Sequence, residues 1–174
     1  MVDCRELPNQ TLLGKYLESG AYTDCYAIDV ASVVSQAQYV EAFYTTWLFK
    51  LERLLLGLIA SRPSTDLGAR ALAVDQTDAF AAWRVEARTP HQLLMCDFQG
   101  RTRSWLMTEV TSDGAAIGTR LYFGSAVVPV TDRRSGRKAM GLAFRVLLGF
   151  HKVYSRLLLR AAGSRVLRGC NNGY

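Results

Sequence analysis

Four consecutive segments of this chain have the character of β-strands, and only short turn-forming sequences separate them. The breaks hold Thr89-Pro90, Gln99-Gly100 and Ser112-Asp113-Gly114, which are typical of turns. Connections this short join antiparallel neighbours, because a parallel crossover needs about a dozen residues or more. The sequence therefore predicts an antiparallel meander of four strands, over residues 80–88, 92–98, 102–111 and 117–128.

A long amphipathic helix is predicted after the meander, over about residues 138–162. No Asp or Glu follows Asp132, whereas ten Lys or Arg do, and five of these cations fall on one side of a helical wheel. The opposite side is apolar apart from His151 and Tyr154, which are capable of more than packing. We expect the apolar side to lie on the sheet and the cationic side to face outward. The cationic side consists of Lys138, Arg145, Lys152, Arg156 and Arg160.

The first half of the chain is predicted to contain one strand and one interrupted helix. Residues 21–30 have strand character, and Ser35 with Gln38 forms the pattern of a capping box at a helix start. Apolar residues then recur at helical spacing, and Thr45-Thr46 is the expected division into two helices. The other segments are expected to be irregular: an arm over 1–20, a loop over 64–78 with a short extended piece at 71–74, a polar loop over 129–137 and a flexible tail over 164–174.

Length and composition indicate a single globular domain spanning residues 1–174. The chain is 49% hydrophobic and 21% charged, which is ordinary for a folded protein, and its net charge is +6. Its four cysteines form no CxxC pair, no histidine stands at metal-ligand spacing, and no Walker A or GxGxxG sequence occurs. We therefore expect free thiols, no metal and no cofactor. No export signal and no bilayer-spanning apolar run are visible, which favours a cytoplasmic protein.

The predicted order of elements, which is strand, helix, antiparallel meander and long C-terminal helix, resembles the helix-grip arrangement of the START-like, or SRPBCC, superfamily. Four short motifs between about residues 7 and 162 are similar to those of DUF2867, a family of uncharacterised bacterial proteins. They are Tyr22-Thr23-Asp24-Cys25-Tyr26, Trp83-Arg84-Val85, Gly118-Thr119-Arg120-Leu121 and Gly149-Phe150-His151. The resemblance implies an α+β fold in which a curved antiparallel β-sheet wraps around the C-terminal helix and encloses a deep apolar cavity. The superfamily includes lipid carriers, hormone receptors and polyketide cyclases, and we carry over no activity from DUF2867.

Six residues are predicted to line this cavity and to bind a small apolar or amphipathic ligand, as in a non-enzymatic carrier or sensor. They are Trp83 and Phe123 as walls, Leu147 and Leu158 as an apolar floor, and His151 and Tyr154 as polar anchors. His151 could orient a ligand oxygen or act as a general base, and the alternative for each of the six is ordinary packing in the core. Trp105 shares its side of the strand with Arg103 and Glu109, which is compatible with the outer face of the sheet.

Two further functions stay open at the level of the sequence. A polyketide cyclase-like enzyme would use His151 or Asp97 as its acid–base group, and Asp97 would qualify only if it faced the cavity rather than solvent or the strand end beside Gly100. A peripheral module would contact an anionic membrane surface through the cationic side of the last helix, unless those cations are merely solvated or paired with acids from the N-terminal part. No nucleic-acid partner is expected, because no recognition motif occurs, and the protein is expected to be a monomer or a homodimer.

Overall fold

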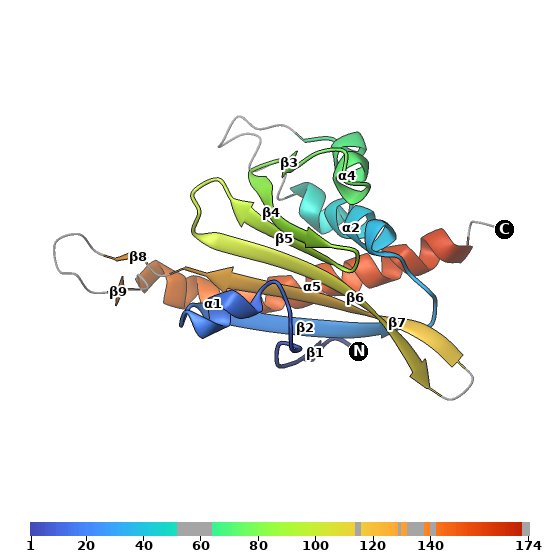
Figure 1. Cartoon of the computed structure of the whole chain (residues 1–174), viewed down its shortest axis with the longest axis horizontal. Helices are drawn as coiled ribbons and strands as arrows, with labels where there is room; N and C mark the ends of the chain where they lie inside the picture. Colours follow the sequence, from blue (N-terminus) through green and yellow to red (C-terminus); the bar gives the residue numbers. More distant parts are fainter. Residues whose placement is uncertain (52–63, 114–115, 129, 132–137, 140–141, 172–174) are drawn as a thin grey trace.

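The computed structural model describes residues 1–51, 64–113, 116–128, 130–131, 138–139 and 142–171. It is an α+β protein in which seven antiparallel strands form one sheet, in the order β1-β2-β7-β6-β5-β4-β3 (Figure 1). The strands of the sheet are β1 (Asp3–Cys4), β2 (Tyr22–Val30), β3 (Ala79–Phe80), β4 (Trp83–Thr89), β5 (Gln92–Asp97), β6 (Thr102–Asp113) and β7 (Ala116–Val127). The described helices are α1 (Gly14–Glu18), α2 (Gln36–Tyr44), α4 (Asp66–Ala73) and α5 (Leu142–Asn171).

The predicted antiparallel meander is confirmed, because β4, β5, β6 and β7 follow one another across the sheet. β6 and β7 pair from Thr102 opposite Val127 to Asp113 opposite Ala116, so β6 is two residues longer than predicted and β7 begins and ends one residue earlier. β2 pairs with the other edge of β7, with Tyr22 opposite Val127. This pairing places the first long strand beside the last one, although about a hundred residues separate them in sequence.

The predicted start and end of the first long helix are also confirmed. The Ser35 side chain accepts a hydrogen bond from the backbone N–H of Gln38, and the Gln38 side chain accepts one from the Ser35 backbone, which completes a capping box. α2 ends at Tyr44, and the Thr45 and Thr46 hydroxyls donate to the carbonyls of Glu41 and Phe43. Thr46 also accepts the N–H of Phe49, so the two threonines close one helix and cap the next turn.

The main core lies between the inner face of the sheet and the helices α2, α4 and α5. Residues at alternate positions of the strands point to this face, among them Leu106 and Leu121, and both are fully buried. From the helices come Phe43, Leu72 and Leu158, which are equally buried. Figure 1 shows α5 running along the sheet, where it packs against β2 and β7 as well as against α2.

A second core lies on the outer face, under the N-terminal arm. Trp105 is completely buried there with Leu13, Leu94 and Tyr122, which confirms that its side of β6 faces outward. Its indole Nε1 donates a 2.9 Å hydrogen bond to the Gln92 side chain, whose oxygen also accepts the N–H of Leu12 at 2.8 Å. The arm over residues 1–20, which was predicted to be irregular, contains the short elements β1 and α1, and its residue Leu13 packs with Trp105 in this core.

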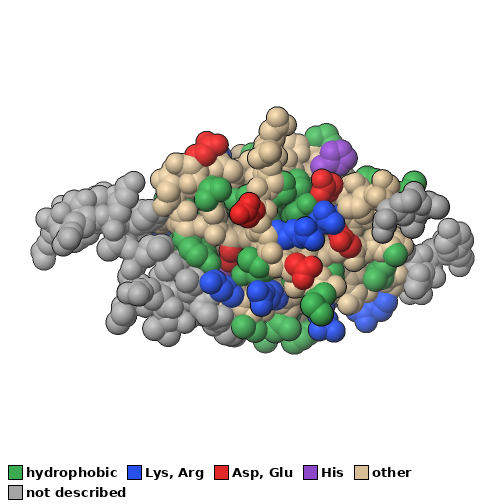
Figure 2. Space-filling view, turned by 90° about the horizontal axis from the view of Figure 1, so that it is seen from below, with side chains coloured by type: hydrophobic (Ala, Val, Ile, Leu, Met, Phe, Trp, Pro, Cys, Tyr) green, Lys and Arg blue, Asp and Glu red, His purple; other side chains and the backbone are tan. Residues whose placement is uncertain are grey.

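Ion pairs hold α1 against the outer face of the sheet. Arg103 donates to the Tyr16 hydroxyl at 2.7 Å and to Glu86 at 2.6 Å, and Glu86 also accepts from Lys15 at 2.6 Å. On the face drawn in Figure 2, basic and acidic side chains likewise lie among one another rather than in separate regions. The guanidinium of Arg103 therefore lies on the outer face, where it binds Tyr16 and Glu86.

The prediction for residues 64–78 is wrong, because this segment contains the helix α4 rather than a loop with an extended piece at 71–74. Thr65 caps α4 by accepting the N–H of Gly68. Ala69 and Leu72 are buried against α2 and Phe80. The helix has only eight residues and contains Gly68, a poor helix former, which weakens its signal in the sequence.

The bounds predicted for the last helix also need correction. α5 begins at Leu142, and residues 138–139 instead form the short strand β9. β9 pairs with β8 (Val130–Thr131), which lies within the segment 129–137 that was predicted to be a polar loop. At the other end α5 continues to Asn171, so the tail predicted over 164–174 is helical as far as that residue. Val166 is 5% exposed and packs in the main core, which explains why the helix does not end near residue 162.

Candidate functional site

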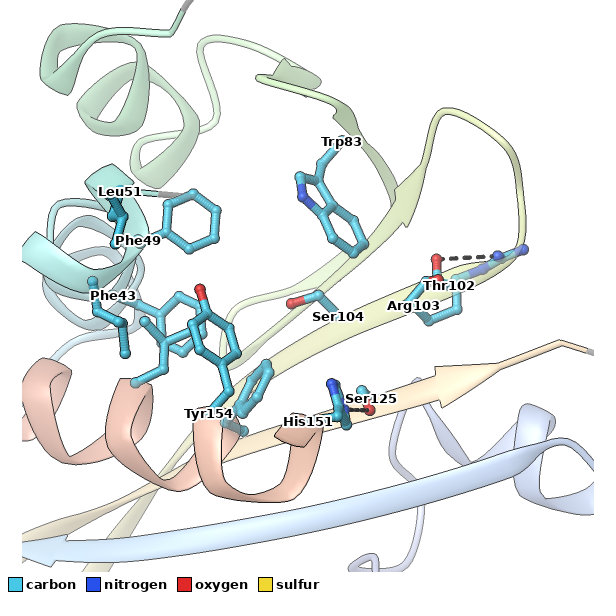
Figure 3. A pocket seen from close by; sticks show the side chains of 13 residues that line it. Phe43, Phe49, Leu51, Trp83, Thr102, Arg103, Ser104, Ser125, His151 and Tyr154 are labelled. Atoms are coloured by element: carbon cyan, nitrogen blue, oxygen red, sulfur yellow. Dashed lines mark hydrogen bonds between the residues drawn. The ribbon is translucent and has the colours of Figure 1, made fainter. Parts of the chain in front are cut away.

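A cavity of about 380 Å³ lies between the inner face of the sheet and the helices α2 and α5 (Figure 3). Its wall comes from α2 and the residues that follow it, from β4, from β6 and β7, and from α5. The described residues that line it are Phe43, Leu48, Phe49, Leu51, Trp83, Thr102, Arg103, Ser104, Phe123, Ser125, His151, Tyr154 and Leu158. Most of these are apolar or aromatic, as in sites for small organic molecules.

Five of the six residues predicted to bind a ligand surround this one cavity: Trp83, Phe123, His151, Tyr154 and Leu158. The sixth, Leu147, belongs to α5, but its side chain lies outside the described residues. Figure 3 shows Trp83 on the sheet side, across the cavity from Tyr154 on the helix side. The sheet and α5 thus bring together residues that are about seventy positions apart in sequence.

The aromatic wall contributed by α2 was missed from the sequence. The Phe43 ring centroid lies 5.0 Å from that of Phe123 and 6.1 Å from that of Phe49, and all three side chains are buried. The helical spacing of apolar residues identified this part of the chain as a helix, but it did not distinguish core residues from cavity residues. That distinction depends on how far α2 stands from the sheet.

A row of short polar side chains crosses the inner face at one end of the cavity. Ser104 lies opposite Ser125 in the β6–β7 pairing, and Ser125 lies opposite Asp24 in the β2–β7 pairing. The Ser125 hydroxyl donates a 2.6 Å hydrogen bond to Asp24 Oδ1, and the Ser125 backbone N–H donates a 3.1 Å bond to the same oxygen. His151 completes the arrangement from α5, with its Nε2 2.8 Å from Ser125 Oγ and 3.4 Å from Asp24 Oδ2.

We name Asp24, Ser125 and His151 the polar cluster. In this cluster Ser125 and His151 contact the buried carboxylate of Asp24. The side chain of Asp24 is only 6% exposed. Burial acts to raise the pKa of this carboxyl group, but the imidazole of His151 and the hydrogen bonds from Ser125 outweigh it and hold the pKa below its usual value. Asp24 is therefore ionised near neutral pH and can only accept hydrogen bonds.

The polar cluster contains the residue types of a serine hydrolase triad, but its connectivity is different. In a triad the histidine takes the serine proton, and the carboxylate binds the other nitrogen of the histidine. Here the serine proton is directed at Asp24, and Asp24 contacts the same nitrogen, Nε2, that faces Ser125. The geometry thus favours a fixed and oriented imidazole over an activated serine.

Trp83 offers a polar atom as well as an apolar wall. Its indole N–H is buried and has no hydrogen-bond partner among the described residues. In Figure 3 the nitrogen edge of the indole is turned toward the side of the cavity where Phe49 lies. A buried donor without a partner is costly, so this position suits a molecule that brings an acceptor atom.

Asp97 does not take part in the cavity site, although its place in β5 puts it on the inner side of the sheet opposite Trp83. Its Oδ1 accepts the backbone N–H groups of Arg101 at 2.7 Å and Thr102 at 3.2 Å. The carboxylate therefore stabilises the turn around Gly100, where φ is +70°. Three positions were considered for Asp97, which were the cavity, the solvent and the strand end beside Gly100, and the structure shows the strand end.

The cationic side of α5 is described only in part. Lys152, Arg156 and Arg160 are exposed, whereas the side chains of Lys138 and Arg145 lie outside the described residues. Among the ion pairs found between described residues, none involves these three exposed cations, and the Arg156 guanidinium instead lies 5.5 Å from the centre of the Tyr26 ring. Exposed apolar residues stand beside them on the same helix, Val153 at 58% and Leu157 at 52%.

The described part of the chain contains neither a cluster of metal ligands nor a membrane-spanning helix. Its His, Cys, Asp and Glu side chains include no group of three or more that could hold a metal ion. None of its helices is long and apolar enough to cross a membrane.

Comparisons with known proteins leave the family open. No family model matches the chain, and no curated protein matches it. Among solved structures, the chain is similar to the crystal structure of CalU16 from Micromonospora echinospora, with 14% sequence identity and a TM-score of 0.29, over 97% of this chain and 92% of that one. A likeness this low establishes neither a family nor a function, so any functional assignment depends on the cavity itself.

Proposed function

We propose that this protein binds a small apolar or amphipathic ligand in the cavity between the sheet and α5, as a carrier or sensor. The observation that carries the proposal is a cavity of about 380 Å³ with aromatic walls and polar groups gathered at one end. This volume falls in the range of about 300–1,000 Å³ that is typical of small-molecule sites. The aromatic end would exclude water around the ligand, and the polar cluster would orient it.

We further propose that the fold is a START-like helix grip and that the motifs similar to DUF2867 reflect membership of that family. The order of the seven antiparallel strands and the long C-terminal helix support this assignment. So does the position of the cavity, which lies between those two elements as the superfamily resemblance implies.

The proposal can be tested with a neutral fluorescent probe, N-phenyl-1-naphthylamine, whose emission rises in an apolar site. The wild-type protein should bind the probe at one saturable site, and Trp83→Ala should weaken binding about tenfold or more, because an aromatic wall is lost. Trp47→Ala is the matched control, since Trp47 is 71% exposed and is not among the residues that line the cavity. Equal losses in both variants, or no saturable binding, would contradict the proposal.

A second candidate function is an enzyme in which His151 acts as the acid–base group. The contact between His151 and the buried Asp24 favours it, because a carboxylate beside an imidazole stabilises the protonated ring that general base catalysis produces. Asp97 no longer competes for this role, since its carboxylate is bound in a turn.

Molecules that co-purify with the protein distinguish the two functions. Solvent extracts of the wild-type protein and of His151→Ala would be compared by mass spectrometry, with Asp97→Asn as the control. A carrier yields the same compound from all three proteins, in a smaller amount from the His151 variant. An enzyme yields a different compound from the His151 variant alone, because the unconverted substrate stays in the cavity.

We also propose that the exposed side of α5 contacts anionic membrane surfaces. Its cations Lys152, Arg156 and Arg160 would bind lipid headgroups, while Val153 and Leu157 would lie in the interfacial layer. Such contact would suit a protein that exchanges an apolar ligand with a membrane. It predicts binding that weakens as salt rises.

A further inference from the structure

We propose that the ligand of this cavity is a neutral molecule that presents a hydrogen-bond donor, such as a hydroxyl group, to Nδ1 of His151. The inference deepens the proposed binding function and rests on it. It follows from the direction of each hydrogen bond in the polar cluster and from the charges around the cavity.

The tautomer of a neutral His151 follows from its neighbours. Asp24 is ionised and can only accept, so the Ser125 hydroxyl donates its single proton to Asp24 Oδ1 over 2.6 Å. The Ser125 oxygen can therefore only accept from the imidazole, whose Nε2 lies 2.8 Å away. The proton of a neutral His151 must then be on Nε2, directed at Ser125 and toward Asp24 Oδ2.

The other ring nitrogen is consequently an acceptor. In a neutral imidazole that carries its proton on Nε2, Nδ1 presents a lone pair. Figure 3 shows this nitrogen turned away from Ser125, on the side of the cavity where Ser104 lies. A ligand at this end of the cavity meets an acceptor held in a fixed orientation, which a neutral donor such as a hydroxyl group can satisfy.

The charges around the cavity argue against an anionic ligand. The ionised carboxylate of Asp24 lies directly behind His151, so a second negative charge at Nδ1 would be repelled. Arg103 is the cationic residue among the described residues that line the cavity, and its guanidinium binds Tyr16 and Glu86 on the outer face of the sheet. A carboxylate ligand would therefore enter without a counter-charge from these residues.

Trp83 adds an independent requirement on the opposite side of the cavity. Its buried indole N–H has no partner among the described residues, so an acceptor such as a carbonyl or ether oxygen on the ligand would satisfy it. The two polar contacts together describe a molecule that is apolar over most of its surface, with a donor at the His151 end and an acceptor near Trp83.

Three probes of similar shape test the donor requirement: 1-naphthol, 1-methoxynaphthalene and 1-naphthoate. Each would compete with N-phenyl-1-naphthylamine at mildly alkaline pH, which favours the neutral form of an imidazole. We expect 1-naphthol to bind about fivefold or more tightly than 1-methoxynaphthalene, which has no donor, and about tenfold or more tightly than 1-naphthoate. In His151→Phe the advantage of 1-naphthol over 1-methoxynaphthalene should disappear, whereas the exposed-histidine control His91→Phe should keep it.

A second measurement does not depend on the folding of a His151 variant. The chain has two histidines, so His91→Ala leaves a single imidazole whose nitrogens can be observed by ¹⁵N NMR. We expect Nε2 to be protonated and Nδ1 unprotonated in the free protein, and the Nδ1 signal to shift when 1-naphthol binds. A proton on Nδ1, or equal binding of the three probes, would overturn the inference and leave the binding function intact. Failure of every probe to displace the fluorophore, or of the fluorophore to bind, would overturn both.

Discussion

The most informative single substitution in this protein is Ser125→Ala, because Ser125 connects the buried carboxylate of Asp24 to His151. The variant retains the 3.1 Å hydrogen bond from its backbone N–H to Asp24 Oδ1 but loses the 2.6 Å bond from the hydroxyl. It also removes the acceptor for Nε2 of His151. A carboxylate that is 6% exposed cannot replace the lost bond fully with water.

The expected loss follows from the charge on the acceptor. A hydrogen bond to a charged group contributes about 1.5–3 kcal/mol to stability, so Ser125→Ala should lower the free energy of unfolding by about 2 kcal/mol at neutral pH. For a domain of this size each kcal/mol corresponds to about 2–4 °C, so the melting temperature should fall by about 4–8 °C. Ser104→Ala is the matched control, because Ser104 is a buried serine on the same cavity whose hydroxyl forms no hydrogen bond with another described residue.

The pH dependence distinguishes this explanation from a general packing defect. The pKa of Asp24 is lowered by folding, so its ionised form stabilises the native protein above the unfolded pKa of about 4, and this stabilisation is lost as pH falls through the folded pKa. Urea unfolding of the wild-type protein and of Ser125→Ala should therefore show a difference in the free energy of unfolding that shrinks to about half once Asp24 is protonated. A difference that stays constant down to pH ~3, or that equals the loss in Ser104→Ala, would refute the role assigned to Asp24.

Three further outcomes are expected. Gly124→Ala should lower stability by about 1–3 kcal/mol, because its Cβ would stand 2.9 Å from Trp105 and from the Asp24 carbonyl oxygen, whereas Gly169→Ala in α5, with open space around it, should be neutral or stabilising in thermal melts. Trp105→Ala should cost about 3–5 kcal/mol in urea unfolding, since it empties the core under the N-terminal arm. The double variant Lys152→Glu/Arg156→Glu should lose sedimentation with phosphatidylglycerol vesicles in low salt, and equal binding of the wild-type protein to phosphatidylcholine vesicles would refute membrane contact through charge.

Elements with a strong local pattern were predicted correctly from the sequence. The meander was recognised because each of its turns carries turn-forming residues and each strand has the composition of a strand. The capping box at Ser35 and the helix division at Thr45-Thr46 depend on hydrogen bonds between residues within four positions of each other. Local chemistry of this kind is visible in sequence because the partners are neighbours.

Elements that depend on distant contacts were predicted less well. α4 is short and contains Gly68, and the packing of its buried residues Ala69 and Leu72 on α2 and Phe80 stabilises it. The last eight residues of α5, from 164 to 171, were predicted to be a flexible tail, although Val166 is buried in the core. The burial of Trp105 on the outer face depends on the N-terminal arm, which lies some ninety residues earlier in the chain.

The residues of the candidate site also differ in how well the sequence identified them. The sequence identified His151, Tyr154 and Leu158 as one side of the last helix, because helical spacing fixes which residues share a side. It did not identify Asp24 and Ser125, since each is an ordinary polar residue in a strand until the β2–β7 pairing places them opposite each other. Asp97 was considered as an acid–base group because the sequence does not reveal the hydrogen bonds that hold its carboxylate in the turn.

The sequence by itself determined the strands of the meander, the capped helix and the two-sided character of α5, because periodicity and turn chemistry act between residues close in the chain. Tertiary structure alone decided that β2 pairs with β7, that α2 and α5 leave a cavity against the sheet, and that a buried carboxylate orients His151. The physical reason is that strand alternation fixes which side chains share a face, whereas the packing of helices and the pairing of distant strands decide which face is buried and what it meets.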